Sequence, residues 1–304
     1  MSPGPADPQS ILARTRGLTV IENAPMSELT TWKVGGPARF LIKIETRDAL
    51  GEALLALREE GVKAMVLGNG SNVLVSDSGF DGAVIRLRGE LALLEVDGEN
   101  LEAGGGAGLA AAVSRSAKAS LSGLEFAFGI PGTVGGAVMT NAGTFLGDIA
   151  GVVSEVEVVG LDGVGSAFTP SAGAYREPLV PVGSVVTRAR FKLASGDASK
   201  ISKTMQDIRS RRESTQPVGE ATAGSVFKNP AGMSAGKLLD ECGFKGRAVG
   251  GASVSGVHAN FIVNGGGATA ADIERLMNLM AGEVEARFGV RLQPEVELIG
   301  FKEL

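Results

Sequence analysis

One segment constrains the fold of this chain more than any other: Gly123 to Gly143, which reads GLEFAFGIPGTVGGAVMTNAG. It is rich in glycine and apolar residues, and Glu125 is its only ionisable group. An ordinary surface loop would carry more charge. A core strand would contain less glycine, because glycine loses more backbone entropy on folding and has no side chain to pack. The segment therefore indicates a backbone that comes close to a large ligand.

Composition narrows the classes of protein that remain. The chain has 304 residues, 44% of them hydrophobic and 21% charged, which is enough for a sizeable core in two or three domains. A net charge of −5 argues against a general nucleic-acid binder. One cysteine, Cys242, and one histidine argue against an internal disulfide and a zinc site, so we expect no metal. We see no signal peptide or membrane-spanning run, and we expect a cytoplasmic protein with a disordered lead over residues 1–18.

The periodicity of apolar residues predicts an α+β chain in three parts. Residues 19–88 contain a helix that Thr46 caps, between short strands. Residues 89–199 contain a hairpin that turns at Asp97-Gly98, an alanine-rich helix and two later strands. Residues 200–304 contain helices capped by Ser234 and Thr269, and a final strand at 295–299.

Three glycine loops are candidates for ligand contact: Gly35-Gly36-Pro37, the run LGNGSNVLV at 67–75, and the 123–143 segment. In the second loop, Gly68 and Gly70 permit positive φ, so successive N–H groups can converge on a pyrophosphate. An ordinary turn uses the same residue types, and both interpretations stay open for this loop alone. The Walker pattern is absent, and no GxGxxG opens a helix after the first strand, so a dinucleotide must be held in another way.

Five motifs in order resemble the UDP-N-acetylenolpyruvoylglucosamine reductase (MurB) family, from about Thr30 onward: TTWKVGGPA, LGNGSNVLV, the 123–143 segment, AGSVFKNP and QPEVELIG. The resemblance implies the FAD-binding fold of vanillyl-alcohol-oxidase (PCMH) type, with two α+β subdomains at 19–88 and 89–199. It also implies a substrate-binding α+β domain at 200–304. The implied reaction reduces the enolpyruvyl ether to UDP-N-acetylmuramate with NADPH, for peptidoglycan synthesis, cell-wall growth, cell shape and cell division. The partners implied are small molecules, with no nucleic acid and no membrane insertion.

The resemblance also assigns roles to residues. It implies that Arg176, Ser225 and Glu295 are catalytic: the serine donates a proton to C2 of the substrate, and the other two stabilise the developing enolate. It implies substrate contacts for Asn229 and His258, although a lone histidine beside an apolar strand is more often structural. The implied FAD contacts lie in two loops: Gly68, Asn69, Gly70, Ser71 and Asn72, and Gly129, Ile130, Pro131, Gly132, Thr133, Gly135, Gly136, Asn141, Ala142 and Gly143.

Other interpretations remain open. The single tyrosine, Tyr175, indicates the shorter form of the family, which lacks a tyrosine lid over the substrate. Arg211 and Arg212 are suited either to substrate phosphates or to a solvated helix end. An FAD-dependent oxidase of a small alcohol or hydroxy acid, and a non-catalytic nucleotide-binding protein, are the alternative functions. The contexts of Ser225, Asn229 and Glu295 argue against both.

Overall fold

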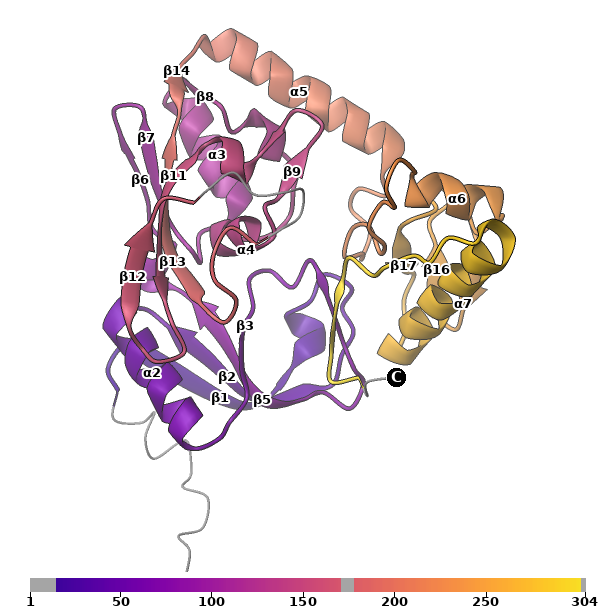
Figure 1. Cartoon of the computed structure of the whole chain (residues 1–304), viewed down its shortest axis with the longest axis horizontal. Helices are drawn as coiled ribbons and strands as arrows, with labels where there is room; N and C mark the ends of the chain where they lie inside the picture. Colours follow the sequence, from indigo (N-terminus) through magenta and orange to yellow (C-terminus); the bar gives the residue numbers. More distant parts are fainter. Residues whose placement is uncertain (1–14, 171–177, 302–304) are drawn as a thin grey trace, which may run out of the picture. The chain divides into compact units, whose positions relative to one another are not determined.

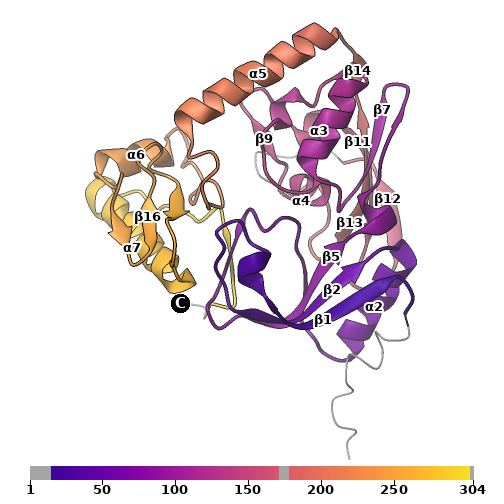
Figure 2. The same cartoon turned by 180° about the vertical axis from the view of Figure 1, so that it is seen from behind.

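The computed structural model describes residues 15–170 and 178–301. The described chain forms two compact units (Figures 1 and 2). Unit 1 comprises the chain up to Glu22, then Phe40–Gly68 and Gly82–Arg209. Unit 2 comprises Asn23–Arg39, Asn69–Asp81 and the chain from Ser210 onward. Two early segments are therefore built into the same unit as the C-terminal third.

A four-stranded sheet forms the first layer, with strand order β1 (Leu18–Pro25), β2 (Pro37–Ile44), β5 (Phe80–Leu87) and β3 (Ala64–Val66). Helix α2 (Arg47–Glu59) lies on one face of it (Figure 2). As expected, the Thr46 side chain caps this helix by accepting the Ala49 N–H, and Gly61 follows its end at φ 65°. Leu50 and Ala53 are fully buried in the core between helix and sheet.

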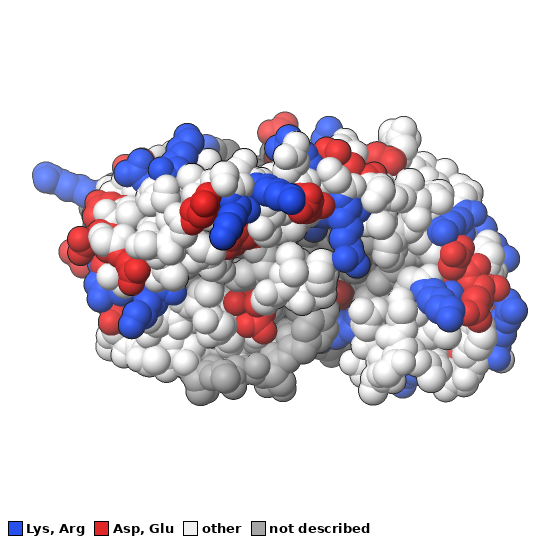
Figure 3. All heavy atoms as spheres, turned by 90° about the horizontal axis from the view of Figure 1, so that it is seen from above, with Lys and Arg blue, Asp and Glu red and all other residues white. Residues whose placement is uncertain are grey.

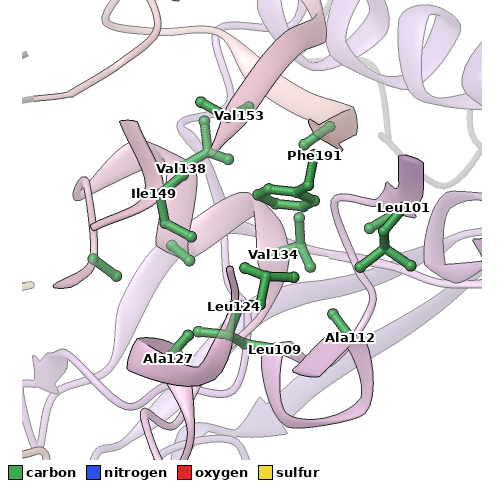
Figure 4. Packing of buried hydrophobic residues seen from close by; sticks show 14 of the residues in the cluster. Leu101, Leu109, Ala112, Leu124, Ala127, Val134, Val138, Ile149, Val153 and Phe191 are labelled. Carbon is green, nitrogen blue, oxygen red and sulfur yellow. The ribbon is translucent and has the colours of Figure 1, made fainter. Parts of the chain in front are cut away.

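The second layer of unit 1 is a five-stranded antiparallel sheet, in the order β12 (Gly165–Phe168), β11 (Val153–Val159), β13 (Val185–Lys192), β7 (Asn100–Gly104) and β6 (Leu94–Asp97). The expected hairpin is confirmed, with Asp97 paired to Asn100 and Gly98 at φ 56°. Helices α3 (Leu109–Lys118) and α4 (Val134–Met139) contribute to its core around the fully buried Phe191 (Figure 4).

Charged side chains form a ladder on the strands of this sheet. Glu157 binds Arg47 at 2.9 Å and also pairs with Arg188; Arg188 in turn binds Glu102 at 2.7 Å, and Glu102 pairs with Arg190. The hydrogen bond from Arg190 lowers the pKa of the Glu102 carboxyl. Such partly exposed pairs contribute little singly, about 0–1 kcal/mol each. Acidic and basic side chains are likewise interspersed over the face that Figure 3 presents.

Unit 2 is built on the helices α6 (Ala235–Glu241) and α7 (Ala270–Phe288), with the small sheet β15–β16–β17 (Ala248–Val249, Ala252–Val254, Ile262–Asn264). Trp32 is fully buried in its core, and the indole N–H donates to the Ile262 carbonyl at 2.7 Å. The Asn264 amide returns a bond of 2.8 Å to the Trp32 carbonyl. These reciprocal bonds fix the early segment within the core of unit 2.

The loop after strand β4 (Val73–Val75) makes a second such attachment. Both carboxylate oxygens of Asp77 accept the first N–H groups of α7, from Ala270 at 2.8 Å and Ala271 at 2.9 Å. A Cβ on Gly36 would lie 2.2 Å from the Asp77 carbonyl oxygen, so this glycine allows two backbones to touch. Close packing therefore explains Gly36 in the first glycine loop without a ligand.

Some predicted elements differ from the observed ones. The 123–143 segment, for which no helix was predicted, contains α4 and the turn η3 (Glu125–Ala127). The first strand of the predicted hairpin, β6, starts at Leu94 and follows a 3-10 turn, η2 (Gly89–Ala92), that was not predicted. The final strand β18 (Glu297–Ile299) starts two residues later than expected and pairs with β4. The remaining elements are η1 (Met26–Glu28), β8 (Leu121–Ser122), β9 (Gly143–Thr144), β10 (Gly147–Asp148), η4 (Ile149–Gly151), β14 (Ala194–Ser195) and α5 (Ala198–Thr215).

The expected lead, residues 1–18, lies mostly outside the described residues. No helix in the described part of the chain combines the length and the apolar character that crossing a bilayer requires.

Candidate functional site

Two glycines of the 123–143 segment form the turn that precedes α4. Gly129 and Gly132 adopt φ of 78° and 133°, a conformation that L side chains rarely take, so the turn before α4 requires them. The Thr133 hydroxyl then caps α4 by accepting the Gly136 N–H at 3.3 Å. The segment that appeared to be a loop is thus a tight turn followed by a short, capped helix.

Gly135 and Gly136 are neighbours in α4 with opposite environments. The Gly135 N–H donates to the Gly105 carbonyl at 2.8 Å, and a Cβ added to Gly135 would lie 2.9 Å from that oxygen. Packing therefore requires Gly135. Gly136 is exposed, and a Cβ there would meet only the Thr133 hydroxyl, at 3.5 Å. Neither backbone conformation nor packing explains Gly136, and its missing side chain leaves space of the kind that a bound cofactor needs.

Gly68, the first residue of one predicted cofactor loop, lies against the other predicted loop inside unit 1. A Cβ on Gly68 would lie 2.6 Å from the Thr133 hydroxyl oxygen, so the end of the 64–68 segment touches the start of α4. Gly70 belongs to unit 2, and two observations show that this position requires glycine. Its φ is 63°, and a Cβ added to it would lie 2.2 Å from the Leu29 carbonyl oxygen. The Gly70 carbonyl accepts the Thr31 N–H at 3.0 Å.

Several predicted cofactor residues are bonded within the protein. Asn141 is 1% exposed, with φ 40°, and its side-chain oxygen accepts the Ala150 N–H at 3.0 Å. Ala142 is buried beside it, and a Cβ on Gly143 would meet that of Asp148 at 2.6 Å. These three residues hold the β9–β10 turn together. Gly129, Pro131 and Asn69 are exposed, and Ile130, Gly132 and Ser71 are half-buried.

Ser225 and Glu295 lie on neighbouring segments of unit 2. The segment from Ser225 to Lys228 runs between two others: Ser225 bridges to Phe261, and Phe227 bridges to Pro294. The Glu295 N–H donates to the Val226 carbonyl at 2.8 Å. Both predicted catalytic side chains are half-buried, and within the described part of the chain the Ser225 hydroxyl has no hydrogen-bond partner. The structure therefore brings two of the three predicted catalytic residues together.

Asn72, predicted as a cofactor residue, is tied to the same place. Its amide donates to the Glu295 carbonyl at 3.1 Å, and its own carbonyl accepts the Glu297 N–H at 2.9 Å. Asn72 and Val226 thus bond the two backbone groups of Glu295, its carbonyl and its N–H respectively. The third predicted catalytic residue, Arg176, lies outside the described residues.

Asn229 and His258 come together at the start of α6. The Asn229 side-chain oxygen accepts the Ala235 N–H at 3.0 Å, and a Cβ on the next residue, Gly236, would lie 2.8 Å from His258 Cε1. His258 Nδ1 accepts the Asn260 N–H at 3.1 Å, so the proton of the neutral ring is on Nε2. Burial, followed by the charge of Lys245, lowers the pKa of His258. The imidazole is therefore neutral near pH 7.

Asn260, which follows His258 by two residues, was not predicted from the sequence. This side chain is 3% exposed, and its amide makes two bonds to the backbone of one residue: it accepts the Phe227 N–H at 3.0 Å and donates to the Phe227 carbonyl at 2.8 Å. A polar residue inside the apolar run ANFIV was the available signal. Of the two basic residues noted at the end of α5, Arg212 is half-buried, and burial lowers its pKa.

Comparison with known proteins identifies this arrangement. The family model "UDP-N-acetylenolpyruvoylglucosamine reductase, C-terminal domain" matches residues 216–299, and "FAD binding domain" matches residues 38–169. A UDP-N-acetylenolpyruvoylglucosamine reductase from Anaeromyxobacter sp. is 44% identical over 98% of this chain and 94% of its own length. One from Clostridium botulinum is 42% identical over 92% of each.

Solved structures agree with the sequence comparisons. The crystal structure of UDP-N-acetylenolpyruvylglucosamine reductase (MurB) from Thermus caldophilus matches with a TM-score of 0.80 at 39% identity, over 93% of this chain and 98% of that one. A berberine bridge enzyme matches 64% of this chain and 44% of its own, with a TM-score of 0.51 at 16% identity, and shows the shared fold alone. The expected α+β fold of the FAD-binding, vanillyl-alcohol-oxidase type is confirmed. This chain belongs to the UDP-N-acetylenolpyruvoylglucosamine reductase family.

Proposed function

We infer that this chain is the oxidoreductase that reduces UDP-N-acetylglucosamine enolpyruvate to UDP-N-acetylmuramate, with FAD as cofactor and NADPH as reductant. The observation that carries this inference is the 44% identity to a reductase over 98% of the chain. The alternative, an FAD-dependent oxidase, is not favoured, because the berberine bridge enzyme shares the fold at only 16% identity. The substrate and reductant are small molecules of peptidoglycan precursor synthesis.

The residues fit a bound FAD. The open space at the exposed Gly136 leaves room for a ligand beside backbone that carries no side chain. When bound, FAD would supply the hydride chemistry that links NADPH to C3 of the enolpyruvyl group. The chain's own residues then have to stabilise negative charge on the substrate and protonate C2 from one face.

Ser225 is the proton donor in this proposal. The half-buried Ser225 hydroxyl, which has no hydrogen-bond partner among the described residues, supports this role. Its closeness to Glu295 also supports it, because the next residue, Val226, accepts the Glu295 N–H. A serine hydroxyl is a very weak acid, so it needs a charged neighbour or a water to resupply its proton. Glu295 and Arg176 are proposed to provide the charges that polarise the substrate carboxylate and enolate.

Asn229 and His258 are proposed to contact the UDP-sugar from the start of α6. A neutral His258 with its proton on Nε2 is suited to donate a hydrogen bond to a substrate oxygen. We further propose FAD-binding subdomains at 19–88 and 89–199 and a substrate domain at 200–304, which the family matches at 38–169 and 216–299 support. A cytoplasmic location, with roles in cell shape and cell division, follows from the proposed reaction.

The test separates the two half-reactions in a stopped-flow instrument. In Ser225→Ala, we expect flavin reduction by NADPH at the wild-type rate. We expect reoxidation by the enolpyruvyl substrate to slow by a factor of about 10² to 10⁴, the usual contribution of a general acid. Equal slowing of both half-reactions would show that Ser225 is structural.

A further inference from the structure

The chain reverses direction between His258 and Phe261, next to the segment that carries Ser225. The Phe261 N–H donates to the His258 carbonyl at 3.1 Å, which closes the turn. Ser225 still pairs with Phe261, and the Val226 N–H still donates to the Asn260 carbonyl at 2.9 Å. Because of this turn, the His258–Phe261 segment does not pair through its backbone with Phe227.

The Asn260 side chain replaces that missing backbone. Its carboxamide oxygen accepts the Phe227 N–H and its NH₂ donates to the Phe227 carbonyl, which are the two bonds that a paired strand residue would make. An amide group alone among side chains offers one donor and one acceptor in this geometry. The pairing of the 225–228 segment is thereby extended by one residue.

The other edge of the same segment is held by the strand of Glu295. The Glu295 N–H bonds to Val226, and the Lys228 N–H donates to the Gln293 carbonyl at 2.9 Å. Phe227 is therefore held on both edges. On one edge its bridge partner is Pro294, the residue before Glu295, and on the other the Asn260 side chain bonds it to the turn at His258. A shift of Phe227 would move Ser225 relative to Glu295.

We propose that Asn260 is a positioning residue for the reduction of the enolpyruvyl substrate: it fixes the strand that presents Ser225 beside Glu295. This proposal rests on the proposed role of Ser225. Because Asn260 is buried and both its polar groups are bonded to Phe227, it acts through that backbone and does not itself touch the substrate.

The test uses Asn260→Asp in the FAD-loaded enzyme, since aspartate keeps the size and one acceptor but cannot donate to the Phe227 carbonyl. We expect NADPH to reduce the flavin within twofold of the wild-type rate. Reoxidation by the enolpyruvyl substrate should slow about 10- to 100-fold, the loss typical of a misplacement near 1 Å. We also expect a larger solvent deuterium isotope effect on reoxidation, because proton transfer becomes slower.

Asn264→Asp is the matched control. Asn264 is also in unit 2 and bonded to backbone, but its NH₂ donates to the Trp32 carbonyl and its side-chain oxygen accepts the N–H groups of Gly266 and Ala268, none of which is in the 225–228 segment. We expect it to lower the melting temperature and leave both half-reactions unchanged. If Asn260→Asp folds poorly, Asn260→Ser, which is smaller and uncharged, takes its place in the same measurements.

The outcomes separate the two proposals. If Ser225→Ala slows reoxidation but the folded Asn260 variants do not, the positioning role is wrong and the role of Ser225 stands. If Ser225→Ala leaves reoxidation unchanged, the proposed proton donor is wrong and the positioning proposal falls with it. Equal slowing by the Asn260 and Asn264 variants would also refute positioning, because it would reflect general loosening of the domain.

Discussion

Two adjacent glycines in α4 allow fold and cofactor binding to be separated. Alanine at Gly136 puts a methyl group into open space, with its nearest neighbour the Thr133 hydroxyl at 3.5 Å. Alanine at Gly135 puts the same methyl group 2.9 Å from the Gly105 carbonyl oxygen and 3.3 Å from the Gly105 Cα. The two variants add the same atoms to the same helix, so each is the control for the other.

The magnitudes follow from these distances. In a helix, alanine is about 1 kcal/mol more favourable than glycine, so Gly136→Ala should make the apoprotein slightly more stable. Gly135→Ala gains the same propensity but overpacks against backbone, which costs about 1–3 kcal/mol, so its apoprotein should be no more stable than wild type. If Gly136 borders the cofactor, its new methyl group should weaken FAD binding at least tenfold, or about 1.4 kcal/mol.

Two measurements on flavin-free protein check this. Thermal unfolding reports stability, with about 2–4 °C expected for each kcal/mol in a protein of about this size. Titration with FAD, followed by flavin fluorescence, gives the dissociation constant. We expect Gly136→Ala to have a raised melting temperature together with weakened FAD binding. Unchanged FAD affinity in a stable Gly136→Ala protein would refute a cofactor at Gly136. A lowered melting temperature of Gly136→Ala would refute the conclusion that the added methyl group meets open space.

Three further predictions concern unit 2. Trp32→Phe leaves the Ile262 carbonyl without the indole donor, and we expect chemical denaturation to show a loss of about 1–3 kcal/mol in unfolding free energy. Asp77→Ala removes both carboxylate bonds to the start of α7, so the same measurement should show about 0.5–2 kcal/mol less stability, with Asp81→Ala, largely exposed, as the neutral control. His258 has a folded pKa below its unfolded value, so the unfolded chain binds more protons and stability should fall as pH drops below about 6.5. Protonation of the His258 imidazole also removes the hydrogen bond that Nδ1 accepts from the Asn260 N–H. Melting curves of His258→Gln should lack this part of the pH dependence, because the charges of Lys245 and Asp240 are present in both proteins.

Local signals in the sequence were sufficient where the chain interacts with itself over short distances. Thr46, Ser234 and Thr269 each cap the helix predicted from them, and Asp97-Gly98 makes the expected hairpin. These features depend on residues a few positions apart. The fold and the reaction were predicted from the family resemblance, because its five ordered motifs are spread along the chain from about Thr30 onward.

Long-range contacts were not predictable in this way. Trp32 is bonded to residues some 230 positions away, and Asp77 caps a helix that begins at Ala270. Nothing in the local sequence of either residue marks its partner. Asn260 was missed for the same reason, since its role depends on a turn that removes backbone from Phe227. At Gly36 and Gly135 close backbone packing by itself requires glycine, so the residue type at these positions does not distinguish packing from ligand contact.

The most direct test of the proposed reaction is anaerobic stopped-flow mixing of the NADPH-reduced holoenzyme with UDP-N-acetylglucosamine enolpyruvate, with oxygen as the competing oxidant in a parallel experiment. We predict that the UDP-sugar reoxidises the flavin far faster than oxygen does, and that one UDP-N-acetylmuramate forms for each flavin reoxidised. Rapid reoxidation by oxygen, with no reaction of the UDP-sugar, would contradict the reductase and support the oxidase on the same fold.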